Sequence, residues 1–311
     1  MVAHDSDIRL NELVAAIWNA KWVILFVQIL FGTFLIIYAL SIPNQYKSTA
    51  ILSPSSSDNG GGRLAGSLGS LASLAGVNLA GNSGISSYVA AKEVILTWGF
   101  LEKLITGDEA KKELLAVKDW NPDKDKLIIN EKIYDVTADQ WLIDHKSKGV
   151  VKLGPSSWQT YKSIRNRLQV HQDDETGLVY LSMEHYSPYV AKKWVDMIVK
   201  EINRYMKESN RKEAIQSIEY LKKQIEKTDI SEMRAVFYQL IEEQTKNLML
   251  AEVREDYVFK TLSPAKASEE KSYPKRAFIV IAGLLFVSIL SIVFVLLRYV
   301  YGKSSKALKV T

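Results

Sequence analysis

Two long uncharged runs of apolar residues dominate the hydropathy pattern of this 311-residue chain. The first run extends from Val23 to Ile42 and the second from Ala277 to Leu297. A helix of about 20 apolar residues spans a hydrocarbon core of roughly 30 Å, and aromatic residues gather at its two ends. Such aromatic residues are Trp18, Trp22 and Tyr38 at the first run and Tyr273, Tyr299 and Tyr301 at the second. The pattern predicts two transmembrane helices, at 23–42 and 277–297, rather than buried helices of a soluble core.

The charges outside the two runs predict how the chain crosses the membrane. Two spans place both tails on one side. The tail 298–311 carries Arg298, Lys303, Lys306 and Lys309 and no acidic residue. Lys275 and Arg276 favour the opposite orientation weakly, but a long translocated loop largely escapes the positive-inside rule. We therefore expect tails 1–22 and 298–311 in the cytoplasm and residues 43–276 on the opposite side of the membrane.

Between the spans, the residue patterns predict an α+β domain. The segment YKSTAILS (46–53) has strand composition, and the segments 168–172 and 178–184 alternate around a turn-rich centre, as a β-hairpin does. Helical spacing covers about 88–105, and residues 106–166 read as mixed and mostly helical. The segment YVFKTLSPAKAS, which follows the helical region near 257, is expected to return towards the membrane as a strand.

The stretch 188–257 predicts a long helical hairpin that projects from this α/β base. Ser187 and Pro188 suit the N-cap and first position of a helix, and neither Gly nor Pro follows until Lys227. The apolar stripe of the first half gives way to the polar ESNRKE, so a single globule would not bury the whole helix. TDIS (228–231) then ends it, and a second long helix is expected from Met233 to about Tyr257.

A glycine-rich stretch near the start of the loop predicts a packing segment. GGGRLAGSLGSLASLAGVNLAGNSG, from Gly60, holds 8 of the 16 glycines of the chain. The spacing of Leu64, Leu68 and Leu71 places them on one helical face, and Leu74 follows at the same interval. A helix so rich in glycine is marginal by itself, so we expect these leucines to pack or to mediate oligomerisation. The stretch lacks the Gly-Lys-Ser/Thr of a phosphate-binding loop.

Candidate chemical groups are few. The chain has no cysteine, and none of its histidines, His4, His145, His171 and His185, stands in a metal-binding pattern. Asp123-Lys124-Asp125 and Asp173-Asp174-Glu175 are better interpreted as polar turns than as catalytic or metal sites. Gln28 within the first span is either an interhelical hydrogen-bonding group or a tolerated polar residue, the second being slightly favoured. We expect no catalytic residues, cofactor or metal, and a nearly neutral loop disfavours nucleic acid.

Several of these segments together resemble the Wzz family of polysaccharide co-polymerases. The resemblance rests on the two terminal spans, on SLGSLASLAGVNLAG (67–81), on RAVFYQLIEEQTKNLMLAEVREDYVF (234–259) and on the pre-membrane prolines Pro264 and Pro274. It implies a non-catalytic regulator that sets the modal chain length of lipopolysaccharide O-antigen or a related polysaccharide. It further implies a ring-like homo-oligomer, commonly an octamer, that works with an inner-membrane polymerase and its lipid-linked glycan.

Two alternative functions stay open at this point. Two spans and a long hairpin also suit a structural adaptor of an envelope polysaccharide export complex, although no lipoyl-like domain is recognisable. An enzyme of envelope glycan synthesis is disfavoured, because the chain offers no acid–base pair, metal cluster or nucleotide loop.

Overall fold

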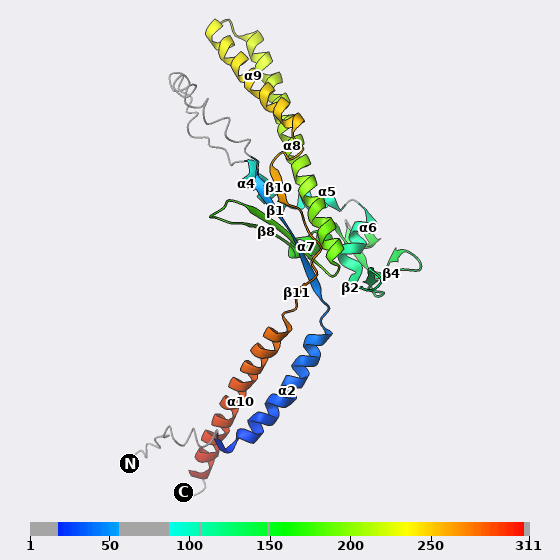
Figure 1. Cartoon of the computed structure of the whole chain (residues 1–311), viewed down its shortest axis with the longest axis vertical. Helices are drawn as coiled ribbons and strands as arrows, with labels where there is room; N and C mark the ends of the chain where they lie inside the picture. The colour runs from blue at the N-terminus through cyan, green and yellow to red at the C-terminus, as the bar shows by residue number, and fades with distance from the viewer. Residues whose placement is uncertain (1–17, 56–86, 106, 148–149, 308–311) are drawn as a thin grey trace, which may run out of the picture. The chain divides into compact units, whose positions relative to one another are not determined.

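The computed structural model describes residues 18–55, 87–105, 107–147 and 150–307, and the chain divides into two compact units (Figure 1). Met1–Asn44 and Ser272–Thr311 form the first unit, and Gln45–Lys271 form the second. The first unit holds the apolar helices α2 (Lys21–Ser41) and α10 (Arg276–Ala307). The second holds a β-sheet, several short helices and strands, and a helical hairpin. The expected α+β fold with two terminal apolar helices is confirmed.

Helices α2 and α10 are apolar on nearly every face, and most of their side chains are exposed in the chain by itself. Both are long and apolar enough to cross a membrane. Phe26 of α2 is 67% exposed and Phe286 of α10 is 64% exposed. A buried core helix of a soluble protein would hide such side chains from water, so these two helices do not fit that class.

The sheet of the second unit is antiparallel, with β1 in its interior. Its strand order is β10 (Phe259–Ser263), β1 (Gln45–Pro54), β9 (Val179–His185) and β8 (Leu168–Gln172). The register pairs Tyr46 with His185, and Ile51 with Ser263 on the other side. Along β1, Ser48, Ala50 and Leu52 are buried at alternate positions, so one face of the strand meets the core. The strands predicted at 46–53, 168–172, 178–184 and after 257 are confirmed.

The main core lies between this sheet and the first half of α8 (Pro188–Lys227). The apolar stripe predicted on α8 is buried, and Trp194 at its centre is fully enclosed. From the sheet, Leu52, Leu181 and Phe259 pack into the same cluster, together with Phe100. Burying large apolar side chains is the main favourable term in folding, so this cluster holds α8 on the sheet.

The second half of α8 leaves the core and pairs with α9 (Ser231–Val253) as a hairpin, which confirms the predicted projection (Figure 1). Ser187 caps α8, because its Oγ accepts a hydrogen bond from the amide of Val190 and Pro188 follows it. Lys207 of α8 donates to the carbonyl oxygens of Glu252 and Arg254. These carbonyls lie at the C-terminal end of α9, where they lack helical partners and the helix dipole is negative.

Two expectations for the middle of the chain are wrong. The single helix expected at 88–105 is two helices, because Thr97 adopts an extended conformation and caps the second one. Residues 106–166 are mostly short antiparallel hairpins rather than helices, since strands of two to five residues show no readable period. The elements of this region are α4 (Ser87–Val94), α5 (Trp98–Leu104), α6 (Asp108–Lys111), the π-helical turn η3 (Lys112–Ala116), β2 (Val117–Asn121), β3 (Lys126–Ile129), β4 (Tyr134–Asp135), β5 (Gln140–Trp141), β6 (Asp144–Ser147), β7 (Val150–Leu153) and α7 (Ser157–Arg167).

Candidate functional site

The candidate residues predicted from the sequence do not form one site in the described structure. Leu64, Leu68, Leu71 and Leu74 lie outside the described residues. Pro264 is exposed directly after β10, in the second unit. Pro274 is buried in the first unit, after the short strand β11 (Lys271–Tyr273), and the Tyr273–Pro274 peptide bond is cis.

Arg276, at the start of α10, binds the C-terminal end of α2. Its Nε donates to the carbonyl oxygen of Ala39 at 3.1 Å, and its Nη2 donates to that of Ile42 at 3.4 Å and to Oδ1 of Asn44 at 3.1 Å. The last carbonyls of a helix lack intrahelical partners and carry partial negative charge, which a guanidinium satisfies well. In the sequence Arg276 stands out only as a charge beside the second apolar run, so this role was missed.

A hydrogen bond and close backbone contacts join α2 to α10. Gln28 Nε2 donates to Ser288 Oγ at 2.7 Å, and that hydroxyl donates in turn to the carbonyl oxygen of Leu284. The slightly favoured interpretation of Gln28 as merely tolerated was therefore wrong. A Cβ at Gly283 would lie 2.6 Å from Cδ1 of Leu35, so the missing side chain lets the helices approach closely.

In the second unit, an open pocket of about 430 Å³ surrounds the start of the π-helical turn. Its lining combines four carboxylates, a lysine, two aromatic rings and aliphatic side chains. The polar lining residues include Asp108, Glu109, Lys112 and Asp139, and Tyr134 and Trp141 supply the rings. Single-turn π segments occur frequently at functional positions, which makes this pocket a candidate binding site.

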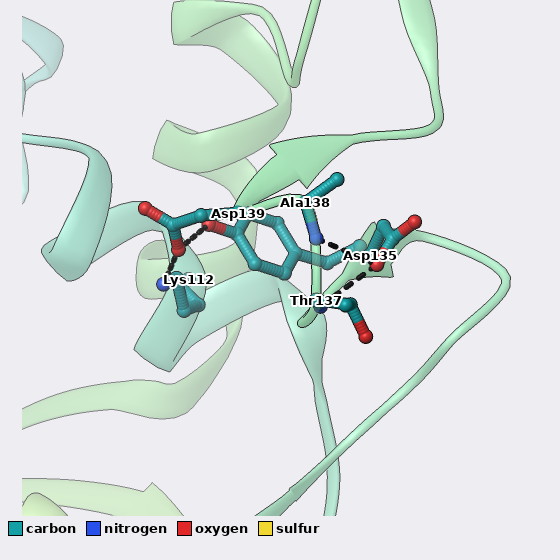
Figure 2. A network of polar contacts seen from close by, with 6 residues as sticks. Lys112, Asp135, Thr137, Ala138 and Asp139 are labelled. Carbon is teal, nitrogen blue, oxygen red and sulfur yellow. Dashed lines mark hydrogen bonds and ion pairs between the residues drawn. The ribbon is translucent and has the colours of Figure 1, made fainter.

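Figure 2 shows the polar network at this pocket. Lys112 Nζ lies 2.8 Å from Asp139 Oδ1 and 4.4 Å from the centre of the Tyr134 ring, and the Tyr134 hydroxyl donates to the same carboxylate. Asp135 accepts the amides of Thr137 and Ala138, which closes the turn between β4 and β5. At the end of this turn Asp139 has a φ of 51°, a conformation that aspartate tolerates better than most residues.

The network holds both charged groups in their ionised forms. The hydrogen bonds from Lys112 and Tyr134 keep the pKa of Asp139 below its ordinary value. The hydrogen bond between Lys112 and Asp139 raises the pKa of Lys112 to about 12, and the contact of Lys112 with Tyr134 acts in the same direction. A general acid or base needs a pKa near the working pH, so this pair suits binding and positioning rather than proton transfer.

His185, the histidine at the end of β9, is buried and fixed as a neutral ring. Its Nε2 lies 2.9 Å from the carbonyl oxygen of Glu113, and its Nδ1 accepts the amide of Ser187 at 3.0 Å. One nitrogen therefore donates and the other accepts, which fixes the tautomer. Burial lowers the pKa of His185 to about 4, and the positive charge of Arg167 acts in the same direction. The imidazole is neutral at pH 7 and both nitrogens are engaged, so it is unsuited to acid–base chemistry.

The remaining polar candidates are turns, as the sequence favoured. Asn121 Oδ1 accepts the amides of Asp123 and Lys124, so the Asp-Lys-Asp triplet lies in the β2–β3 turn. Asp173 accepts the amides of Glu175 and Thr176, and these bonds lower its pKa. His171 lies opposite Tyr180 in the register, whereas His185 lies opposite Tyr46, so the two histidines form no common site. Across the described ranges, no group of three or more potential metal ligands occurs.

Comparisons with known proteins relate the chain to polysaccharide co-polymerases. Residues 6–107 match the family model "Wzz: Chain length determinant protein". The structure resembles a full-length bacterial polysaccharide co-polymerase at 12% identity and a TM-score of 0.41, over 95% of this chain and 99% of the other. It also resembles a fragment of the co-polymerase WzzB from Salmonella Typhimurium at 13% identity and a TM-score of 0.28, over 74% of this chain and 100% of the other. No curated protein matches the chain. The resemblance to the Wzz family inferred from the sequence is confirmed.

Proposed function

We propose that this chain, which carries a Wzz chain length determinant segment at 6–107, regulates the length of a surface polysaccharide without forming glycosidic bonds itself. The match of that segment to the family model is the observation that carries the proposal. The matched segment includes α2, β1 and α4, and thus joins a membrane helix to an interior strand of the sheet. The regulated product is lipopolysaccharide O-antigen or a related polysaccharide.

The proposed location follows from the two apolar helices. Both helices span the bacterial inner membrane, with residues 1–22 and 298–311 in the cytoplasm and residues 43–276 in the periplasm. Their exposed apolar side chains need lipid or other helices as surroundings, which supports this placement. A regulator in this position can meet a membrane-embedded polymerase and the lipid-linked glycan that the polymerase extends.

The proposed working form is a ring-like homo-oligomer, with eight subunits as the family expectation. The helical hairpin supports association, because it leaves large apolar side chains uncovered along much of its length. Exposed examples are Ile215, Tyr220, Met233, Val236, Tyr238, Met249 and Leu250. Large apolar side chains that one element leaves exposed in this number suit a surface that another subunit covers.

The ionisation states of Lys112, Asp139 and His185 fit a regulatory role that needs no proton transfer from these groups. Lys112 and Asp139 are held in their charged forms, and His185 is held neutral with both nitrogens engaged. Neither arrangement exchanges a proton readily near pH 7. Regulation through contacts with a polymerase and its glycan needs no such exchange.

Deleting the gene and separating the surface polysaccharide by size on a gel tests the proposal. Polymerisation should continue, but the clustered chain length should broaden into a decaying distribution. Expression of the full chain from a plasmid should restore the cluster, which controls for effects on neighbouring genes.

Two other results of this experiment would contradict the proposal. Complete loss of long chains would make the protein essential to bond formation or export, as an enzyme or an export adaptor would be. An unchanged size distribution would remove the protein from the pathway.

A further inference from the structure

An aromatic platform lies on α5 and α7, outside the pocket and the membrane helices. It consists of Trp98, Trp158 and Tyr161. The ring centres of Trp98 and Trp158 are 4.8 Å apart, those of Trp98 and Tyr161 are 5.7 Å apart, and those of Trp158 and Tyr161 are 5.3 Å apart. The interplanar angles of these pairs are only 33°, 14° and 27°, so the three rings stack on one another with nearly parallel planes.

The two indoles of the platform are open to solvent. Trp98 is 39% exposed and Trp158 is 45% exposed. Tryptophan carries a large apolar surface that proteins normally cover, so two adjacent exposed indoles suggest a surface that a partner covers. Next to Trp98, a Cβ placed at Gly99 would meet no atom within 4 Å, so the chain borders open space at this residue.

Hydrogen bonds to the backbone hold the helices that carry the platform in place. Thr97 Oγ1 accepts the amide of Phe100 and so fixes the start of α5. At the start of α7, Ser156 and Gln159 form a capping box. The hydroxyl of Tyr161 donates to the carbonyl oxygen of Leu96, which ties α7 to the residues just before α5. Because the rings are ordered in advance, binding to them costs little further conformational entropy.

The surroundings of the rings are polar, and this distinguishes among possible partners. Glu102 Oε2 accepts the Nε1 proton of Trp98 at 3.0 Å, and its carboxylate retains further acceptor sites. Lys162 Nζ lies 5.3 Å from the centre of the Trp158 ring. Within α5 and α7, all of whose residues are described, no large aliphatic side chain is exposed beside the two tryptophans. A lipid tail or the apolar face of a second subunit would require such aliphatic surface.

We propose that this platform binds the polysaccharide whose length the chain regulates, an inference that rests on the proposed function. A sugar ring has a flat face of C–H groups and a rim of hydroxyls. The C–H face packs on the negative face of an indole, and the hydroxyls bond to the carboxylate of Glu102 and the ammonium of Lys162. The platform is thus a contact for successive sugar residues of a growing chain, separate from the contacts with the polymerase.

The test measures binding of polysaccharide to the purified full-length chain in detergent. The probe is the surface polysaccharide of the cells that encode the protein, released from its lipid by mild acid. Exchange of both Trp98 and Trp158 for Ala should raise the dissociation constant of the polysaccharide about tenfold or more, since both stacking surfaces are lost. Exchange of both for Phe keeps the flat rings and should retain most of the affinity. Tyr189→Ala, which removes a 55%-exposed ring from the start of α8, serves as the matched control and should bind as the wild type does.

The size of the oligomer, measured by light scattering on the same samples, separates the alternatives. The inference predicts an unchanged oligomer in the double Ala variant. A smaller oligomer would assign the platform to a contact between subunits and overturn it, as would unchanged affinity. If the wild-type chain fails to bind the polysaccharide while gene deletion still broadens its size distribution, this inference fails and the proposed function stands.

Discussion

At the scale of single residues, His185 shows how the fold fixes a charge state. The ring joins the end of β9 to the π-helical turn through the carbonyl of Glu113, and it joins the start of α8 through the amide of Ser187. A proton on Nδ1 would remove the acceptor for Ser187 and place a cation near Arg167 in a buried position. The folded chain therefore excludes a proton that the unfolded chain accepts.

This exclusion predicts a loss of stability in acid. The folded pKa of His185 is about 4, compared with an ordinary value of 6.5, so the unfolded state binds more protons between these values. The free energy of unfolding should fall by about 3 kcal/mol from this residue alone as the pH drops through that window. His185→Gln keeps a donor and an acceptor but cannot titrate. The difference in thermal midpoint between the wild type and this variant, in detergent, should therefore shrink between pH 7 and pH 4.

A matched variant controls for other acid-sensitive groups. His171→Gln changes an exposed histidine of the neighbouring strand, outside the buried cluster, and should alter the pH dependence of stability less than His185→Gln does. Parallel pH curves for the wild type and His185→Gln would contradict the prediction.

At the scale of elements, one buried amide fastens α8 to the strand that follows the hairpin. Asn203 Oδ1 accepts the amides of Val258 and Phe259, and its Nδ2 donates to the carbonyl of Phe259 at 2.9 Å. Asn203 is 4% exposed, so water cannot replace these bonds. The amide thus sets the position of β10 relative to the helix, near the point where α8 leaves the core.

Replacing this amide should destabilise the second unit strongly. Asn203→Leu leaves two amides and a carbonyl without partners in a buried place, and each costs roughly 1 kcal/mol or more. We expect a loss of about 3 kcal/mol in unfolding free energy, measured by denaturant titration of the detergent-solubilised chain. Asn210→Leu, further along α8, loses a single hydrogen bond to Tyr257 and should cost about 1 kcal/mol. Equal losses in the two variants would show that Asn203 has no special role.

The elements also show which features a sequence can predict. The start of α8 at Ser187-Pro188 and the β8–β9 hairpin were predictable, because capping and alternation are local signals. The hairpins of 106–166 were not, since their strands are too short to show a period. The ion pair of Lys112 and Asp139 was hidden for another reason: the residues are 27 positions apart, and a turn with positive φ brings them together. The platform likewise joins Trp98 to Trp158 across two separate helices.

At the scale of the whole molecule, the connection between the units constrains topology. Only three residues, Ile42 to Asn44, separate the end of α2 from the start of β1. A strand that follows a membrane helix so directly emerges on the side where that helix ends. We propose that residues 43–276 lie in the periplasm and that both tails lie in the cytoplasm.

Reporter fusions test this topology. Alkaline phosphatase folds actively only in the periplasm, so a fusion after Lys246 of α9 should be active and a fusion after Thr311 inactive. Immunoblots should show similar amounts of the two fusions, which controls for expression. The reverse pattern of activity would place the hairpin in the cytoplasm and contradict the proposed location.

Because β1 lies inside the sheet and is made first, its strand pairing can be completed only late in the synthesis of the chain. The strand pairs through Tyr46 with His185 and through Ile51 with Ser263, so its partners leave the ribosome long after it does. At about 5–20 residues per second, the delay before the last partner is made is roughly ten to forty seconds. The edge of β1 that pairs with β10 stays open throughout that interval, and open edges are templates for pairing with other chains. A nascent chain of this protein is therefore most prone to aggregation before translation reaches β10, and it has the greatest need for a holding chaperone in that interval.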